Sequence, residues 1–232
     1  MNIQILQMIE GAKKAKGITV VIDVFRAFSF EAYCFAKGAK KVIPVGDIDL
    51  AYKLKEKNPD IILAGERHGK IMPGFDTGNS PSELMALDVK DKVVVHTTSA
   101  GTQGIANAKN ADEIIGGSLV TAKAIAEYIT KSGAKDVSLV CMGLEAISET
   151  EEDNLCAEYI KSLLEGTSLD MPKEIESLKT TSGAKFFDKA QNDVFPEADF
   201  PMCTELNKFN FVLRLKKSDD GVDYMEKVDI SI

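Results

Sequence analysis

The sequence predicts an α/β fold: a mostly parallel sheet with helices on both faces, followed by a C-terminal α+β extension that ends in a hairpin. Hydrophobic, β-branched runs such as 18–25 are typical of strands buried on both faces. Segments of helical spacing alternate with these runs, and such alternation produces parallel sheets because right-handed crossovers place the connecting helices on the two faces. The alternation stops at about residue 168, which marks the extension.

The first part of the chain contains a regular series of expected strands, over 18–25, 41–45, 61–65, 92–98, 113–117 and 137–143. Between the strands, several helix starts carry capping residues. Ser80 is followed by Pro81 and by an acid at the third helical position, which indicates a helix start. Ser118 is expected to cap a later helix, and Thr150 with Asp153 caps the helix that follows the last of these strands.

The C-terminal part has a different pattern. Residues 171–195 predict short helices, and two strand-like runs within 210–230 predict a closing hairpin that turns at Asp220-Gly221. We therefore divide the chain into an α/β core with the active-site loops, 1–167, and an extension, 168–232, that packs on the core as a smaller lobe.

Composition limits the kinds of partner that the protein has. The chain has 232 residues and a formal net charge of −8, which argues against nucleic acid as a partner. No apolar run approaches the roughly 20 residues of a membrane span, so we expect a cytoplasmic protein with no membrane contact. The four cysteines are too widely spaced for a metal knuckle or a redox pair, and two histidines give little material for a zinc site. Any metal would be held mainly by carboxylates.

Glycine-rich and reactive segments follow the expected strands at their carboxyl ends, where open α/β sheets bind ligands. The segment 97–104, TTSAGTQG, combines hydroxyls and glycines at a helix start and is a candidate anion cradle, and 116–122 is a second. Arg26 and Arg67 carry guanidinium groups that match two oxygens of a phosphate, sulfonate or carboxylate. For each glycine-rich turn taken alone, the alternative interpretation is that it only ends a strand and binds no ligand. The candidate substrate-binding residues are Asn79, Thr97, Thr98, Ser99, Gly101, Thr102 and Ser118.

Carboxylates near several strand ends form a candidate metal site. Asp23, Glu66 and Asp153 are the expected ligands, with Glu152 as an alternative to Asp153, and oxygen ligands of this kind suit Mg²⁺. The structural alternatives are that Asp23 only pairs with Arg26 and that Asp153 only completes a helix cap.

Acid–base and nucleophilic roles fall on the same loops. The candidate catalytic residues are Asp23, Arg26, Arg67, His68 and Asp76. Asp23 is the nucleophile if a phosphoenzyme forms, and otherwise Asp76 or His68 handles the proton. Asp76 has the alternative of shaping a turn, and His96, which closes a hydrophobic strand, is expected to be a core group.

Five segments in this order carry a resemblance to a known family: VIDVFRA (21–27), GERHGKIMPGFDTGNSPSE (65–83), TTSAGTQG (97–104), GGSLVTA (116–122) and ETEEDNLCAEYI (149–160). Together they resemble the 2-phosphosulfolactate phosphatase family, the phosphatases of coenzyme M biosynthesis. The resemblance implies Mg²⁺-dependent hydrolysis of (2R)-2-phospho-3-sulfolactate to 3-sulfolactate and phosphate. It has one local departure, because Phe28 stands where the family often has a small hydroxyl residue. Its bulk either narrows the pocket or packs in the helix.

Two other classes of function remain open at this point. The first is a noncatalytic anion-binding or regulatory module, in which the acids only fix the shape of the loops. The second is a metal-dependent lyase or isomerase of phosphorylated acids, because fold does not determine reaction. Dinucleotide binding is disfavoured, since no GxGxxG follows the first strand. The expected partner is a small anionic substrate, and the general frequency of twofold assemblies favours a homodimer.

Overall fold

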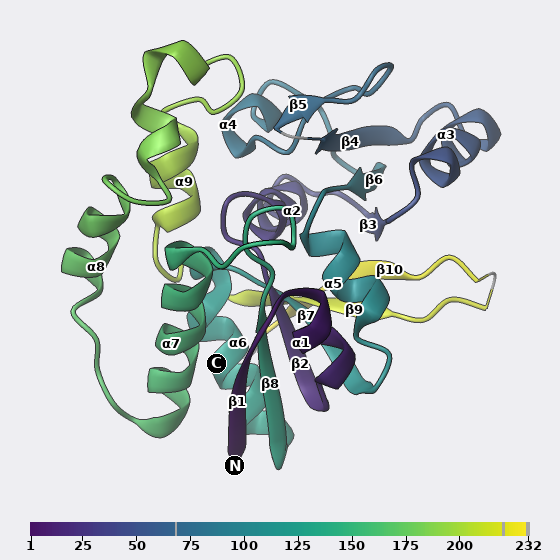
Figure 1. Ribbon diagram of the computed structural model, residues 1–232. Coiled ribbons are helices and arrows are strands. Elements are labelled where there is room, and N and C mark those ends of the chain that lie inside the picture. The colour runs from purple at the N-terminus through teal and green to yellow at the C-terminus, as the bar shows by residue number, and fades with distance from the viewer. Residues whose placement is uncertain (68, 220, 231–232) are drawn as a thin grey trace.

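The computed structural model describes residues 1–67, 69–219 and 221–230 (Figure 1). The strands are β1 (Asn2–Gln7), β2 (Gly17–Ile22), β3 (Lys41–Pro44), β4 (Ile62–Arg67), β5 (Lys70–Ile71), β6 (Val93–Thr97), β7 (Ala111–Gly117), β8 (Asp136–Cys141), β9 (Phe211–Lys216) and β10 (Tyr224–Asp229). The α-helices are α1 (Met8–Lys14), α2 (Ala27–Ala36), α3 (Ile48–Lys57), α4 (Pro81–Leu84), α5 (Gly101–Asn107), α6 (Ala122–Ser132), α7 (Glu151–Glu165), α8 (Met171–Leu178) and α9 (Asp199–Thr204). Short 3₁₀ helices cover η1 (Leu119–Thr121), η2 (Ala184–Phe187) and η3 (Lys189–Gln191).

The strands form one sheet in the order β1-β8-β2-β7-β9-β10-β3-β6-β4-β5. It contains two parallel blocks, β1-β8-β2-β7 and β3-β6-β4, separated by the antiparallel β9–β10 hairpin. The predicted α/β class, the mostly parallel sheet and the closing hairpin are therefore confirmed. The hairpin's position is a new finding, because it lies inside the sheet rather than at an edge (Figure 1). Its strands are buried accordingly, with Val212 and Leu213 fully inaccessible.

Helices cover both faces of the first block, and the side chains of β2 explain why. Val20 and Ile22 join the cluster formed with α6 and α7, whereas Val21 joins the cluster on the opposite side. A strand whose alternate residues enter two cores must be apolar nearly throughout, as the run 18–22 is. On the second side α1 packs against α5 (Figure 1).

The first strand and helix of the chain, β1 and α1, were not expected from the sequence. β1 is an edge strand that pairs in parallel with β8 along its whole length, from Asn2 opposite Asp136 to Gln7 opposite Cys141. Its sequence, NIQILQ, alternates apolar and polar residues and is only partly buried, so it lacks the continuous apolar run by which the other strands were found.

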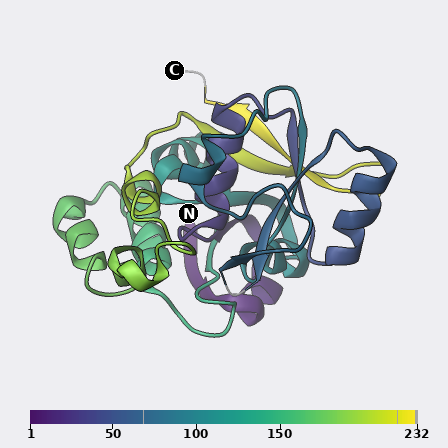
Figure 2. The same ribbon diagram turned by 90° about the horizontal axis from the view of Figure 1, so that it is seen from above.

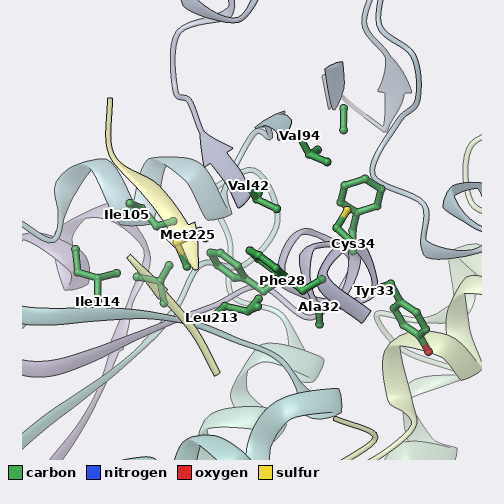
Figure 3. Close-up of a cluster of buried hydrophobic side chains, with 14 of the residues drawn as sticks. Phe28, Ala32, Tyr33, Cys34, Val42, Val94, Ile105, Ile114, Leu213 and Met225 are labelled. Atoms are coloured by element: carbon green, nitrogen blue, oxygen red, sulfur yellow. The ribbon is translucent and has the colours of Figure 1, made fainter. Parts of the chain in front are cut away.

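Helix α2 packs at the junction of the two blocks and the hairpin. Figure 3 shows Phe28 of this helix beside Leu213 of β9 and Met225 of β10. Gly116 of β7 leaves the space for this ring, because a Cβ atom there would lie 2.5 Å from a Phe28 ring carbon. Phe28 is 1% exposed, so its bulk packs in the core and does not narrow the pocket described below.

The helical part of the C-terminal extension lies beside α7 and over α4, on the side of the molecule that Figure 2 shows in green. α8 packs against α7, and α9 packs against α2 and α4. This arrangement brings residues 185–199 close to loops from the first two-thirds of the chain. In the ranges that the structure describes, no helix combines the length and apolarity needed to cross a membrane.

Candidate active site

A cavity of about 160 Å³ lies where loops from both parallel blocks meet the C-terminal extension. The carboxyl ends of β2 and β8 contribute from the first block, and those of β4 and β6 contribute from the second. The strands of the two blocks run in opposite directions, yet their carboxyl ends share this cavity. Among the described residues one pair, Met225 with Val42, joins β10 to β3, so the sheet is weakly paired at this point. The lining residues are Asp23, Phe25, Arg26, Glu66, Gly69, Asn79, Thr98, Ser99, Ala100, Gly143, Leu144, Glu145, Thr150, Glu152, Asp153, Lys185 and Phe195.

Asp23, directly after β2, is held by backbone amides of two loops. Its Oδ1 accepts a hydrogen bond from the N–H of Ala27 at 3.1 Å, and its Oδ2 accepts one from the N–H of Gly101 at 2.9 Å. A Cβ atom at position 101 would lie 3.0 Å from Oδ2, so glycine permits this close approach. Burial raises the pKa of Asp23 to about 6, and the negative charges of Glu66 and Glu152 add to the rise.

Glu66, at the end of β4, is also held by backbone amides of two loops. Its Oε2 accepts from the N–H of Gly69 at 2.7 Å, and its Oε1 accepts from the N–H of Ser99 at 3.1 Å. The side chain is 7% exposed and lines the cavity. Glu66 therefore fixes the loop after β6 to the β4–β5 turn, while its remaining lone pairs stay available to a ligand.

Asp153 and Glu152 come from the first turn of α7. The Oδ1 of Asp153 accepts from the N–H of Val24 and its Oδ2 from the N–H of Gly143, each at 2.8 Å. Asp153 thus joins the loops after β2 and β8. The predicted side-chain cap by Thr150 is not formed, and its hydroxyl has no hydrogen-bond partner among the described residues.

The electrostatics of these two acids show how closely the cavity groups its negative charges. Burial, followed by the charges of Glu152 and Asp23, raises the pKa of Asp153 well above its ordinary value. Burial also raises the pKa of Glu152, and the positive charge of Lys185 opposes that rise. The nearby hydroxyls of Ser182 and Thr150 also lower the pKa of Glu152, but within the described part of the chain neither reaches the buried Oε2 atom with hydrogen-bond geometry.

Arg26 pairs with an acid that the sequence analysis did not identify. Its Nη1 donates to Oδ2 of Asp199 at 2.7 Å, and the two side chains are 4% and 0% exposed. The expected alternative, a pair between Arg26 and Asp23, is not what the structure shows. The other oxygen of Asp199 accepts from the hydroxyls of Ser80 and Ser82 at 2.8 and 2.7 Å and from the N–H of Ser82 at 2.9 Å. Asp199 therefore joins α9, the start of α4 and the cavity arginine.

The structure does not bring every expected site residue to the cavity. Arg67 donates to the backbone carbonyl of Glu66 and to the hydroxyl of Thr97, and neither Arg67 nor Thr97 is among the lining residues. Thr102 bonds to Thr98 instead, which does line the cavity. Ser118 caps η1 and bonds to the hydroxyl of Ser29.

Asp76 is the clearest difference in position. One of its oxygens accepts from the N–H of Leu63 at 2.8 Å and from the ammonium of Lys55 at 3.2 Å, and it lies outside the cavity lining. These contacts agree with the alternative in which Asp76 shapes a turn and does not take part in catalysis. His68 lies outside the described residues. His96 bonds through Nδ1 to Glu31 at 2.8 Å with both side chains fully buried, which confirms it as a core group.

Several polar groups in the cavity have no partner within the described chain. Beside Glu152 and Thr150, they are the amide oxygen of Asn79 and the hydroxyl of Ser99. A buried polar atom without a hydrogen bond costs about 1–3 kcal/mol. Four such groups around one cavity indicate that a polar ligand completes their hydrogen bonding.

The charges of the cavity suit a cation together with an anion. Five acids line it, Asp23, Glu66, Glu145, Glu152 and Asp153, against two cations, Arg26 and Lys185. The described residues contain no preformed cluster of three metal-ligating side chains. However, Mg²⁺ in phosphate-handling sites typically uses one or two carboxylates and completes its shell with water and phosphate oxygens. The orphaned oxygen of Glu152 beside Asp23 fits a site of that kind.

Comparison with known proteins gives a consistent result over nearly the whole chain. Residues 3–218 match the family model described as 2-phosphosulpholactate phosphatase. A protein of Bacillus subtilis (strain 168) named "Probable 2-phosphosulfolactate phosphatase" is 34% identical over 214 residues, 92% of each chain. Proteins with the same name from Caldanaerobacter subterraneus subsp. tengcongensis and Carboxydothermus hydrogenoformans are 35% and 41% identical, over 85% and 71% of this chain and 87% and 68% of their own.

Proposed function

Because the chain belongs to the 2-phosphosulfolactate phosphatase family, we propose that it hydrolyses (2R)-2-phospho-3-sulfolactate, or a closely related phosphorylated hydroxy acid, with Mg²⁺ as cofactor. The products would be 3-sulfolactate and inorganic phosphate. The observation that carries this proposal is the cavity in which Asp23, Glu66 and Glu152 face Arg26 and Lys185. Acids alone would repel a substrate with several negative charges, whereas acids with a bound cation and two basic side chains would attract it.

Mg²⁺ would be held by the acids that line the cavity, with Asp23 and Glu152 as the principal candidates, followed by Glu66 and Asp153. The negative charge of Glu152 contributes to the raised pKa of Asp23, and Glu152 has the unpartnered oxygen. When bound, the ion would supply positive charge to the phosphate oxygens and to the surrounding carboxylates.

Asp23 is the side chain best placed to handle a proton. Burial raises its pKa to about 6 without a metal, and a Mg²⁺ ion bound directly to Asp23 would lower that pKa. Asp23 would therefore act as a general base when the other cavity acids hold the ion. In this step the water oxygen forms a bond to phosphorus, the ester P–O bond breaks, and one water proton passes to Asp23. The leaving ester oxygen takes up a proton from solvent and becomes the hydroxyl of 3-sulfolactate. Two backbone N–H groups hold its carboxylate, so little rearrangement is needed.

Arg26 would bind an anionic group of the substrate with the N–H groups that do not contact Asp199. Its Nη1 is already oriented by that carboxylate, and a guanidinium group fixed in advance loses little entropy when it binds oxygen. Residues of the loop after β6 line the same cavity and add polar groups to it. Positioning and charge stabilisation then account for most of the catalysis expected in phosphoryl transfer.

The test is release of inorganic phosphate from 2-phosphosulfolactate and from a small panel of phosphorylated hydroxy acids, with Mg²⁺ and with a chelator. We expect Mg²⁺-dependent release that is abolished in Asp23→Asn, while circular dichroism shows that the variant is folded. Binding without turnover would favour the anion-binding module. A changed organic product without free phosphate would favour the lyase or isomerase.

A further inference from the structure

We propose that Lys185, together with the rings of Phe25 and Phe195, forms a subsite for the sulfonate group and selects substrates that carry one. This inference rests on the proposed function and concerns a part of the cavity to which the sequence motifs contribute only Phe25. Lys185 and Phe195 belong to the C-terminal extension, in η2 and in the segment before α9.

Lys185 is a cavity cation that makes no contact ion pair with a carboxylate among the described residues. Its ammonium lies 5.1 Å from the centroid of the Phe195 ring, 5.6 Å from that of Phe186 and 5.8 Å from that of Phe25. Cation–π attraction places the charge over these rings. Among the described residues, none forms an ion pair with Lys185 within 4.0 Å. The charge of Lys185 acts on Glu152 without a contact ion pair, and a positive charge in a partly apolar setting favours an anionic ligand.

Phe195 contacts the second cation of the cavity as well as Lys185. The guanidinium carbon of Arg26 also lies 5.1 Å from the Phe195 centroid. The two cations differ in their partners, because Arg26 is neutralised by the fully buried Asp199 whereas Lys185 is not. The lining of the cavity therefore combines carboxylates, which suit a metal ion and phosphate, with basic and aromatic side chains grouped around Phe195.

The chemistry of the two cations assigns the remaining anionic groups of the substrate. A guanidinium group presents paired N–H donors that match the two oxygens of a planar carboxylate. A lysine ammonium is a compact charge with three rotatable donors, which suits the three oxygens of a sulfonate. The rings of Phe25 and Phe195 can cover the apolar CH₂ that carries the sulfonate.

A competing interpretation assigns Lys185 only to Glu152, because its charge opposes the rise in the pKa of that acid. The two interpretations make different predictions for substrates. A counter-ion of Glu152 would influence every substrate equally, through the metal and phosphate end. A sulfonate ligand would influence only substrates that have the sulfonate.

The experiment compares kcat/KM for 2-phosphosulfolactate with kcat/KM for 2-phospholactate, in which hydrogen replaces the sulfonate, for wild type, Lys185→Gln and Lys185→Arg. We expect Lys185→Gln to lower the ratio of the two values by about 10- to 100-fold, the loss typical of a hydrogen bond to a charged group. Lys185→Arg should restore part of the ratio. Lys189→Gln, in the exposed η3 four residues further on, is the matched control and should leave the ratio unchanged. An equal loss on both substrates, or no loss, would overturn the proposal.

A binding measurement separates this inference from the proposed reaction. Calorimetry with Mg²⁺ would compare 3-sulfolactate and lactate as ligands of the wild type and Lys185→Gln. We expect the wild type to prefer 3-sulfolactate and the variant to lose that preference, whether or not phosphate is released from any substrate. If the wild type shows no preference for the sulfonate ligand, or if Lys185→Gln retains it, Lys185 does not form a sulfonate subsite. Failure of phosphate release with the preference intact would instead contradict the proposed reaction alone.

Discussion

Replacement of Asp23 by asparagine should shift the stability of the metal-free protein in favour of the variant as pH rises, relative to wild type, while removing its activity. In the folded protein the pKa of Asp23 is about 6, against an ordinary value of 3.8. The folded state therefore binds the proton more tightly than the unfolded state does. The stability that this group contributes is fully present below its pKa in the unfolded state and is lost as pH rises through its pKa in the folded state. The whole difference corresponds to about 3 kcal/mol.

The asparagine of the Asp23→Asn variant would carry no charge at any pH, but its amide NH₂ would face one of the two backbone N–H donors. Losing that hydrogen bond costs about 1–3 kcal/mol, independent of pH. The absolute stability of the variant at one pH is therefore a weak test. The difference between variant and wild type is a strong one, and we expect it to shift in favour of the variant by about 2–3 kcal/mol between pH 4 and pH 8.

Urea denaturation of both proteins across this pH range, in a chelator, measures that difference. Asp153 and Glu152 titrate in both proteins, so most of their effect on stability cancels when the variant is compared with wild type. The charge of Asp23 also raises the pKa of Asp153, and losing this repulsion favours the variant at high pH as well. A second series with Mg²⁺ should stabilise the wild type above pH 6 and stabilise the variant less, because the ion favours the ionised acid. Parallel pH profiles for the two proteins would refute the placement of Asp23 as a buried acid among the negative charges of this cavity.

Three further substitutions test how the site is held together. Asp199→Ala leaves the guanidinium of Arg26 buried without its carboxylate and should cost about 3–5 kcal/mol in urea denaturation, and a loss below about 1 kcal/mol would show that the pair is not formed. Gly101→Ala brings a Cβ atom to 3.0 Å from Asp23 Oδ2, and we expect about a tenfold or greater loss of kcat/KM in the phosphate-release assay, so wild-type kinetics would contradict the close approach. Asp76→Asn should keep turnover within about twofold, because its side chain lies outside the cavity, and a loss of about a hundredfold would restore the catalytic role expected from the sequence.

The sequence was most informative where a local pattern of residues is compatible with a single structure. The run 18–22 is apolar at every position except Thr19, and both faces of β2 are buried, so strand and sheet type followed directly. Asp23 and Glu66 were found because they come at the ends of such strands, and both line the cavity. In these cases a local pattern determines where the side chain lies.

Other contacts depend on pairings that no local pattern contains. Arg26 and Asp199 are 173 positions apart, and nothing near Asp199 distinguishes it from an ordinary surface acid. Asp76 was instead predicted to be catalytic because its neighbours in the sequence resemble a reactive loop. Its carboxylate accepts hydrogen bonds from Leu63 and Lys55 outside the cavity. The central position of β9 and β10 depends on which strand edges remain free once both parallel blocks have formed.

That central position has a consequence for how the active site forms. The acids come from loops before residue 154, but the buried partner of Arg26 and the cavity lysine come from residues 185–199, and the two strands that join the parallel blocks come later still. Without β9 and β10, β7 would keep only β2 as a neighbour and β3 only β6 among the described strands, and the carboxyl ends that share the cavity would have no common sheet. The acids alone would then be closely spaced negative charges, without Arg26 held in place beside them. The C-terminal extension is therefore part of the cavity's framework, because it supplies the connection between the blocks, the cavity lysine and the carboxylate that pairs with Arg26.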